Sequence, residues 1–414
     1  MRNFLRNNLL ILVILNSSNV FNYLFQLIVG RTLTPADYGS FNALNSLAVV
    51  LSAPVAVLPL VFSRYTVQLS VSGLPQVKSL LVDGFRRMVL VAAGILIIGL
   101  LALPWLKSYL HLDSTPPLMI MLAQLVLSLL LPVLLGVIQG LHRFVHFGFA
   151  SSSVALVRFL GALSLVMALG WGVNGALLSG TLGTLMAMGI AFWTLNDILK
   201  TPRSALPHGI FHKMGRYSLP VFLSTTMVMT LGNLDIVLVR HYCLPEEAGL
   251  YSIAAILGRI AMFLPGVLII VLFPEAVKTQ AAGQEDVRLL WVSLGLTALL
   301  GGGIALACSL WPRPIIALLF GEKYIGAAVL LQIVSAAMAM LAVANVIFTY
   351  CLARSEFTFL WPLAGGVGLM LILIFYFHDT ARTIAEMVLI SVGVILTGTM
   401  GWYLLRVRRP LTSP

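Results

Sequence analysis

The chain has 414 residues; 60% of them are hydrophobic, only 9% are charged, and the formal net charge at pH 7 is +11. Apolar runs recur along the whole chain, and a soluble domain cannot bury that much apolar surface. A bilayer-spanning helix needs about 20 mostly apolar residues, so the composition predicts an all-α polytopic membrane protein. It excludes a soluble nucleic-acid-binding domain with a basic face.

The first apolar run follows a short basic segment, in the sequence MRNFLRNNLLILVILN. A secretory signal peptide also begins with positive charge, but it ends at a small-residue cleavage site, and no such site closes this run. The apolar sequence continues to about residue 29. We therefore expect an uncleaved first spanning helix.

Twelve spans are predicted in all, at residues 9–29, 41–63, 88–106, 117–140, 147–169, 173–195, 217–239, 251–273, 290–311, 325–350, 357–377 and 384–405. With the N-terminus in the cytoplasm, most of the loop lysines and arginines fall on the cytoplasmic side, as the positive-inside rule requires. The net positive charge thus indicates orientation in a membrane and no nucleic-acid partner. We expect a multi-pass protein of the cell inner (plasma) membrane with both termini cytoplasmic.

The longest predicted cytoplasmic loop, NDILKTPRSALPHGIFHKMGRYS, lies at the midpoint of the chain. Sequences on its two sides resemble each other, namely GRTLTPADYGSF (30–41) and VRHYCLPEEAGLY (239–251). A single shift aligns Pro35, Gly39 and Phe41 with Pro245, Gly249 and Tyr251. Internal repeats are a transporter architecture. We expect an N-terminal six-helix lobe (1–195), a cytoplasmic linker (196–216) and a C-terminal six-helix lobe (217–414) around a central cavity.

Amide side chains recur at helical spacing within four of the predicted spans. The ones we select as candidates are Asn16, Asn19, Asn45, Asn233 and Asn345. Polar stripes of this kind commonly join helices by hydrogen bonds in membrane bundles. They also suit a hydrated cavity, and their occurrence in both halves favours that interpretation. The sequence leaves both interpretations open.

The charged residues that lie deepest in the predicted spans are Arg158, Asp235 and Arg259. A charge at a helix centre costs about 2.5–3.5 kcal/mol, so each should face a partner or a cavity. One interpretation is a structural ion pair of Asp235 with Arg259, since their spans are antiparallel neighbours. The other is an anion pathway lined by the arginines, with Asp235 pairing or titrating. Arg64 would lie at the cytoplasmic mouth of such a pathway, or would be an ordinary positive-inside residue.

Several segments together carry a family resemblance. They are VGRTLTPADYGSFNAL after the first span, SRYTVQ after the second, the arginine of the fifth, GNLDIVLVRHYCLPEEAGLYSIAAILGRI across the seventh and eighth, VLFPEAVK after the eighth, and LLFGEKYIGAAVLLQIVSAAMAM entering the tenth. In their order and spacing the chain resembles the Wzx-type oligosaccharide flippases. These are polysaccharide transporters of the multidrug/oligosaccharidyl-lipid/polysaccharide exporter superfamily.

The resemblance implies transport without catalysis or cofactor, by two lobes around a cavity. The family's cargo is an oligosaccharide on a polyprenyl diphosphate, moved from the cytoplasmic to the outer leaflet for polysaccharide biosynthesis. Guanidinium groups bind diphosphate in a bidentate way, and Arg158 and Arg259 match the family's cationic pattern. Asp235 matches its acid in the seventh span.

The resemblance also implies partners. They are the lipid bilayer, the polysaccharide polymerase and other assembly proteins, and H+ or Na+ as a coupling ion. The chain departs from the family in having no acidic residue in its first six spans. A coupling scheme that uses an N-lobe carboxylate has no residue for it here.

Other function classes stay open. A membrane glycosyltransferase or polysaccharide polymerase would need catalytic side chains on a substantial loop, and the predicted external loops are short. A drug/cation antiporter of the same superfamily would favour acids in its cavity. The peptidoglycan-precursor flippase normally has two further helices, and none is predicted after residue 405. The histidine pairs His142/His146 and His208/His212 lack a third ligand and the three cysteines form no close-spaced motif, so we expect no metal site.

Overall fold

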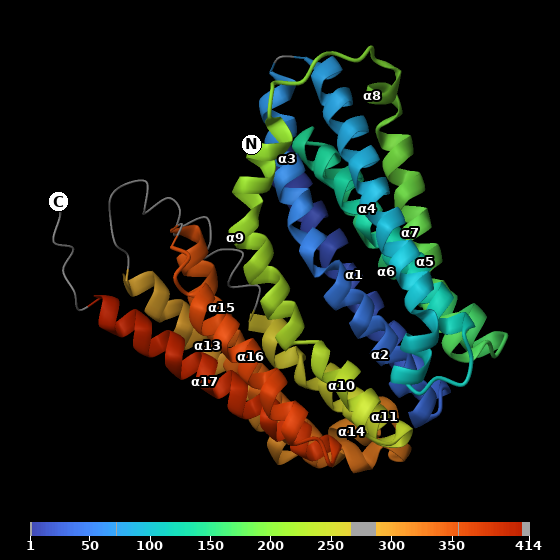
Figure 1. Cartoon of the computed structure of the whole chain (residues 1–414), viewed down its shortest axis with the longest axis vertical. Coiled ribbons are helices and arrows are strands. Elements are labelled where there is room, and N and C mark those ends of the chain that lie inside the picture. The colour runs from blue at the N-terminus through green and yellow to red at the C-terminus, as the bar shows by residue number, and fades with distance from the viewer. Residues whose placement is uncertain (1, 72, 266–286, 355, 408–414) are drawn as a thin grey trace. The chain divides into compact units, whose positions relative to one another are not determined.

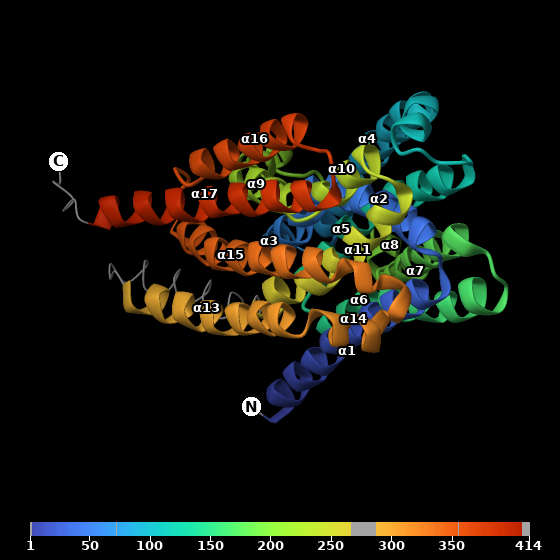
Figure 2. The same cartoon turned by 90° about the horizontal axis from the view of Figure 1, so that it is seen from below.

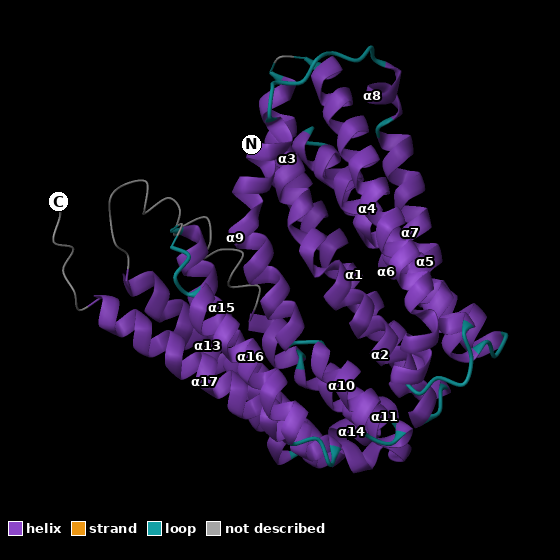
Figure 3. Cartoon of the chain, viewed as in Figure 1, coloured by secondary structure: helices purple, strands orange, loops and turns teal. Residues whose placement is uncertain are grey.

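Every regular element in the described chain is a helix (Figure 3). The computed structural model describes residues 2–71, 73–265, 287–354 and 356–407 (Figure 1). Within these ranges, the side chains of residues 2–16, 217, 287 and 405–407 lie outside the description. Within the described ranges, ten helical segments are long and apolar enough to cross a membrane. The predicted all-α polytopic membrane class is therefore confirmed.

Two of the twelve expected spans are not among these ten segments. The first expected span lies in α1 (Arg2–Thr32) and the eleventh in α16 (Leu360–Tyr376), which is helical and apolar but only 17 residues long. Both are helices, so the structure agrees with the expected secondary structure in these places. The count of twelve spans stays a prediction.

The chain divides into two compact units, Met1–Thr225 and Thr226–Pro414. The helix α9 (Ile210–Leu231) crosses the division. The predicted lobe and linker boundaries, at 195 and 216, stay predictions.

The N-terminal unit contains α1, α2 (Pro35–Ser52), α3 (Leu58–Ser70), α4 (Leu74–Tyr109), α5 (Pro116–Gly140), α6 (Phe144–Gly161), α7 (Gly172–Thr194) and the short α8 (Asn196–Lys200). A 3-10 turn, Ala53–Val57, joins α2 to α3. Proline at 54 and at 59 removes backbone donors there, which accounts for the change of helix type. The expected span 41–63 is thus part of one helical run from 35 to 70.

The core of this unit lies among α3, α4, α5 and α7, where Phe62, Leu80 and Val133 are almost fully buried. Burying each such side chain contributes roughly 1.5–3 kcal/mol. Gly136 allows α5 to approach α3, because a Cβ there would lie 2.8 Å from the carbonyl oxygen of Pro59. The resulting close packing fixes α3 against α5 and leaves α1, α2 and α6 to form the polar site described below.

The C-terminal unit contains α10 (Leu234–Tyr242), α11 (Pro245–Gly258), α13 (Val287–Leu310), α14 (Pro312–Phe320), α15 (Ala328–Ala353), α16 and α17 (Ala381–Val407). The helix α15 lies between α13 and α17 and also packs against α11 (Figures 1 and 2). Gly366 allows α16 to reach α17, since a Cβ there would lie only 1.9 Å from Ile395 Cγ1.

The two matched sequence segments have the same local structure. Pro35 begins α2 and Pro245 begins α11, as expected for proline in the first turn of a helix. The matched aromatic residues, Phe41 and Tyr251, are both fully buried. These matched positions bring each unit's aromatic residue beside its candidate site.

Candidate functional site

The candidate site of the N-terminal unit is built around Arg158 on α6. Its Nη2 donates a hydrogen bond to Oδ1 of Asn45 on α2, at 2.9 Å. Its guanidinium carbon lies 4.2 Å from the ring centroid of Phe25 on α1, which is a cation–π distance. The structure thus brings together two residues predicted from the sequence, Arg158 and Asn45, and adds Phe25.

Arg158 has no carboxylate partner among the described residues, where its polar contact is the neutral amide of Asn45. Its side chain is half-buried, and its Nε is buried and makes no hydrogen bond to any described residue. A buried donor without an acceptor costs roughly 1–3 kcal/mol, and more on a charged group. This guanidinium therefore has donor capacity and positive charge for an anionic ligand.

Two further polar contacts join the helices that carry this site. Tyr38 donates from its hydroxyl to Oε1 of Gln26 at 3.0 Å, which links α2 to α1. Ser18 donates to Ser152 at 2.7 Å, which links α1 to α6. In both contacts the α1 side chain serves helix–helix hydrogen bonding, the first of the two interpretations of the polar stripe.

A short π-helical segment, Ala162–Ala168, directly follows α6. Its wider turn includes a hydrogen bond from the Leu169 N–H to the Ser164 carbonyl at 2.9 Å. Such segments are rare and are frequent at functional sites. Arg158 therefore lies one turn before an irregularity that the sequence pattern did not reveal.

The other predicted residues of this unit are Asn16, Asn19 and Arg64. Asn19 is exposed on α1 and Arg64 is exposed on α3. The side chain of Asn16 lies outside the described residues. The predicted roles of these three residues stay predictions.

The candidate site of the C-terminal unit is the group Asp235, Tyr251 and Arg259. Asp235 is in the first turn of α10, Tyr251 is on α11, and Arg259 caps the C-terminal end of α11. Nη2 of Arg259 lies 3.8 Å from Oδ1 of Asp235, and the two side chains are 13% and 1% exposed. The hydroxyl of Tyr251 donates to Oδ2 of Asp235 at 2.8 Å. The carboxylate is therefore compensated inside this unit by one cation and one hydroxyl donor.

The pairing of Asp235 with Arg259 was one of two interpretations that the sequence left open, and Tyr251 was missed as a partner. The available signal was its position at the start of the next predicted span, which is antiparallel to the span that carries Asp235. Arg240, which directly follows the seventh predicted span, is 4% exposed within α10, which continues to Tyr242.

The two amides predicted in this unit have local environments. Asn233 donates from Nδ2 to the Met229 carbonyl at 2.9 Å, four residues earlier. Asn345 is half-buried on α15. Among the described residues, no group of three or more His, Cys, Asp and Glu side chains is arranged to hold a metal ion. Both sites can bind and neutralise charge; neither presents a nucleophile beside a general base.

Comparison with known proteins gives a family. A family model described as polysaccharide biosynthesis protein matches residues 28–329. None of the curated proteins matches the chain.

Solved structures give the fold. An inward-facing multidrug resistance transporter of the MATE family is similar with a TM-score of 0.78 at 13% identity, over 94% of each chain. The lipid II flippase MurJ in an inward closed conformation is similar with a TM-score of 0.74 at 12% identity, over 96% of this chain and 87% of that one. A transporter of the same superfamily from Pyrococcus furiosus is similar with a TM-score of 0.54 at 15% identity, over 97% and 95%. At these identities the likeness shows the fold alone. The chain therefore belongs to the polysaccharide biosynthesis protein family and has the membrane-transporter fold of the multidrug/oligosaccharidyl-lipid/polysaccharide exporter superfamily.

Proposed function

We propose that this protein flips a polyprenyl-diphosphate-linked oligosaccharide from the cytoplasmic to the outer leaflet of the cell inner membrane, for the biosynthesis of a surface polysaccharide such as O-antigen, capsule or exopolysaccharide. The family supports the pathway, and the fold supports transport without catalysis. The finer organisation stays part of this proposal: twelve spans in two six-helix lobes around a central cavity, with both termini cytoplasmic.

The observation that carries the proposal is the state of Arg158. Its hydrogen-bond partner is an uncharged amide, and its Nε has no acceptor among the described residues. A diphosphate supplies several anionic oxygens, and guanidinium is the side chain best matched to them. Exchange of a neutral acceptor for a charged one strengthens the hydrogen bond. We assign the diphosphate primarily to Arg158.

Arg259 has a different role in this proposal, because Asp235 already faces it at 3.8 Å. It contributes to the substrate path only after the carboxylate is displaced or protonated. The pair therefore serves as an internal ion pair, or couples transport to H+ or Na+. Asn16, Asn19, Asn45, Asn233 and Asn345 would contact sugar hydroxyls, and Arg64 would act at the cytoplasmic mouth.

Two alternatives belong to the same superfamily. MATE transporters are described as multidrug resistance proteins, and MurJ as a lipid II flippase. The Pyrococcus furiosus transporter is described as having a binding pocket of reversed polarity that suggests a different function. In the N-terminal unit, Arg158 is a half-buried cation with no carboxylate partner among the described residues, which favours an anionic cargo over a cationic drug. It does not distinguish between lipid-linked oligosaccharides.

The test is complementation of a deletion strain. We expect the strain to lose its surface polysaccharide and to retain lipid-linked repeat units on the cytoplasmic leaflet. The wild-type gene should restore export, and Arg158→Ala should not. Arg158→Lys should restore it partly, because the lysine ammonium keeps the charge but cannot donate the two parallel hydrogen bonds of a guanidinium.

Arg382→Ala is the matched control, because this arginine is exposed and pairs with Glu386 on the surface. It should restore export fully at equal protein abundance. Full export with Arg158→Ala would refute the role of this arginine. A deletion strain with normal polysaccharide but stalled peptidoglycan precursors, or with drug sensitivity alone, would refute the proposed cargo.

A further inference from the structure

The helix α1 has two exposed sides of opposite character. Asn19, Asn22 and Tyr23 are exposed on one side, and Val20 and Leu24 are exposed on the other. The three polar residues stand three and four positions from Asn19, so their side chains are neighbours on one helical face. These side chains make no hydrogen bond with another described residue. We call them the polar face of α1; its donors and acceptors are available to a ligand.

The packing of α1 against α6 places this polar face beside Arg158. Ser18 bonds to a serine of α6 at 2.7 Å, and the ring of Phe21 lies 5.6 Å from an aromatic ring of α6. Phe25 continues this packed stripe and lies under Arg158. Residues three apart on a helix are neighbours. Asn22 therefore lies next to Phe25, and the polar face begins beside the ring that holds the arginine.

The polar face extends from Arg158 in one direction along α1. Asn22 and Asn19 lie about 4.5 Å and 9 Å from Phe25 along the helix axis, at 1.5 Å per residue. In the opposite direction, Gln26 accepts the hydroxyl of Tyr38, which is fully buried, so α2 covers α1 there. A group attached to a diphosphate at the arginine would therefore extend toward Asn19.

The chemistry of this face suits an uncharged, hydroxylated ring. An asparagine side chain donates and accepts hydrogen bonds, as does the tyrosine hydroxyl, and sugar hydroxyls need both kinds of partner. The electron-rich face of the Tyr23 ring attracts the weakly positive C–H groups of a sugar ring. An acyl chain would leave the amides without partners, which is costly, and Asn19 lies at the centre of the expected first span. A second phosphate would find no cation on this face.

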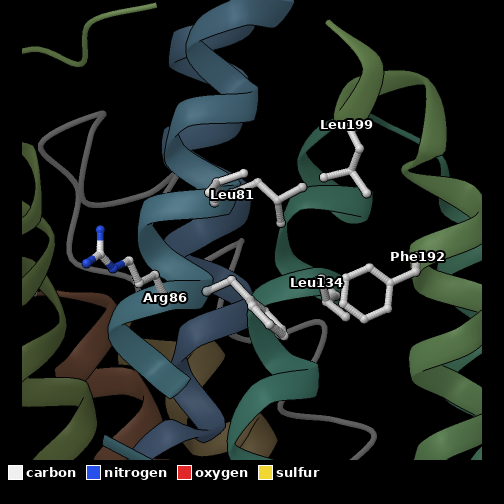
Figure 4. Close-up of a pocket in the computed structure, with 7 residues that line it drawn as sticks. Leu81, Arg86, Leu134, Phe192 and Leu199 are labelled. Carbon is white, nitrogen blue, oxygen red and sulfur yellow. The ribbon is translucent and has the colours of Figure 1, made fainter. Parts of the chain in front are cut away.

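The apolar pocket of the same unit offers no such partners (Figure 4). Leucine, valine and phenylalanine side chains line it, together with Arg86. The guanidinium of Arg86 points away from Phe192 and Leu199 (Figure 4). A sugar ring in this pocket would have hydroxyl groups without acceptors or donors. Hydroxyl groups therefore find partners on the polar face of α1 and not in this pocket.

We propose that Asn19, Asn22 and Tyr23 bind the sugar residue next to the diphosphate. The Tyr23 ring lies against the sugar ring, and the two amides bind its hydroxyl groups. This sugar site rests on the proposed function, because the diphosphate at Arg158 is its anchor. It adds a selective element that includes Asn22 and Tyr23: Arg158 binds the diphosphate whatever the sugar, and the polar face binds the sugar itself.

The test compares the binding of two lipids to the purified full chain in nanodiscs by native mass spectrometry. One lipid is the lipid-linked repeat unit extracted from the deletion strain. The other is a polyprenyl diphosphate without sugar. Wild type should bind the repeat-unit lipid roughly ten-fold more tightly or better, as several neutral hydrogen bonds would provide.

Three variants remove the sugar contacts one at a time. Asn19→Leu, Asn22→Leu and Tyr23→Leu should each weaken binding of the repeat-unit lipid roughly three- to five-fold, the effect of one neutral contact. Binding of the sugar-free lipid should not change, because Arg158 is intact. Tyr23→Phe should keep most of the affinity for the repeat-unit lipid, because it keeps the ring. These side chains are exposed, so the variants should fold like wild type.

Leu24→Ala is the matched control, since Leu24 is exposed on the apolar side of the same helix. It should leave the binding of both lipids unchanged. Equal losses for both lipids in the three leucine variants, or equal wild-type affinity for the two lipids, would overturn the sugar site and leave the proposed function standing. A wild type that binds neither lipid, or a deletion strain that accumulates no repeat units, would refute the proposed function and the sugar site with it.

Discussion

Each unit places an arginine beside a residue at a matched position of the two similar sequences. The type of that neighbouring residue differs between the units. The shift that aligns Phe41 with Tyr251 also aligns Phe25 with Asp235. In the N-terminal unit, Phe25 and Phe41 are in ring contact at 5.7 Å, and Phe25 lies under Arg158. In the C-terminal unit, the Tyr251 hydroxyl binds Asp235, which faces Arg259.

The difference concerns charge. An aromatic ring attracts a guanidinium without occupying its in-plane donors, whereas a carboxylate neutralises it and competes with any other anion. One arginine is thus kept available for a ligand, and the other is compensated within its own unit. The residue type at these two matched positions decides whether the nearby arginine faces an aromatic ring or a carboxylate.

Removal of Asp235 should have the most severe effect on folding. Asp235→Asn leaves Arg259 without its carboxylate, and breaking a buried pair typically costs about 3–5 kcal/mol. We expect little folded protein, measured by abundance after detergent extraction and size-exclusion chromatography. Adding Arg259→Gln should restore much of it.

A double variant no more abundant than the worse single variant would contradict the pairing. So would Asp235→Asn protein that folds normally but transports poorly and has lost a dependence on pH or Na+ that the wild type shows. That second result would identify Asp235 as a titrating or ion-coupling residue.

Tyr251→Phe tests the hydroxyl donor alone. A hydrogen bond to a charged group contributes roughly 1.5–3 kcal/mol, so this variant should be less stable than wild type but more stable than Asp235→Asn. Thermal unfolding of the purified protein measures the difference. Phe41→Leu is the control for aromatic volume at the matched position, and it should not alter the stability effect of Asp235→Asn. Stability equal to wild type in Tyr251→Phe would show that the hydroxyl does not support the carboxylate.

Phe25→Asp should convert the N-terminal site into a copy of the C-terminal one. A carboxylate beneath Arg158 would pair with it, and diphosphate binding should weaken about ten-fold, or about 1.4 kcal/mol. Phe25→Leu should lose the ring contact but keep most binding, because Arg158 keeps its charge. Unchanged binding in a folded Phe25→Asp variant would show that the charge state of Arg158 does not govern affinity.

The exposed pair of Arg143 with Asp197 shows how much stability an ion pair outside the membrane contributes, for comparison with the buried pair. The hydrogen bond from Arg143 lowers the pKa of Asp197 below its usual value. Its contribution is therefore present above the ordinary pKa of an aspartate, about 4, and is lost as pH falls through the lowered value. Exposed pairs contribute about 0–1 kcal/mol, so Asp197→Asn should lower stability slightly at pH 7 and not at pH 2–3. A loss as large as that of Asp235→Asn would contradict the contrast between exposed and buried pairs.

Apolar runs predicted the membrane class and most helices, because a bilayer requires long apolar segments whatever their tertiary contacts. The predicted span 41–63 covers only part of the helical run 35–70. The first turn of this run is polar and begins at Pro35, after the N-cap residue Thr34, so it carries no apolar signal. Charge and span order raised an ion pair of Asp235 with Arg259 as one of two interpretations, because the spans that carry them are antiparallel neighbours. The amides of α1 were less informative, because Asn19 is exposed and another amide of the same helix, Gln26, bonds to Tyr38 across a helix interface.

Contacts that depend on helix rotation and on which helices adjoin were not predictable from one sequence. Nothing in the pattern indicated that Phe25 would lie under Arg158, or that Tyr251 would face the acid. The π-helical turn after α6 has no sequence signal that distinguishes it from an α-helix. These three features, which distinguish the sites from ordinary helix packing, all depend on tertiary structure.

Binding of a sugar-free polyprenyl diphosphate to the purified full chain in nanodiscs tests the distinction between the two arginines most directly. Wild type, Arg158→Gln and the charge-neutral double variant Asp235→Asn/Arg259→Gln would be compared at equal folded fraction. Arg158→Gln should weaken binding at least ten-fold, while the double variant should bind like wild type. A loss in the double variant equal to or greater than that in Arg158→Gln would contradict the assignment of the diphosphate to the N-terminal unit.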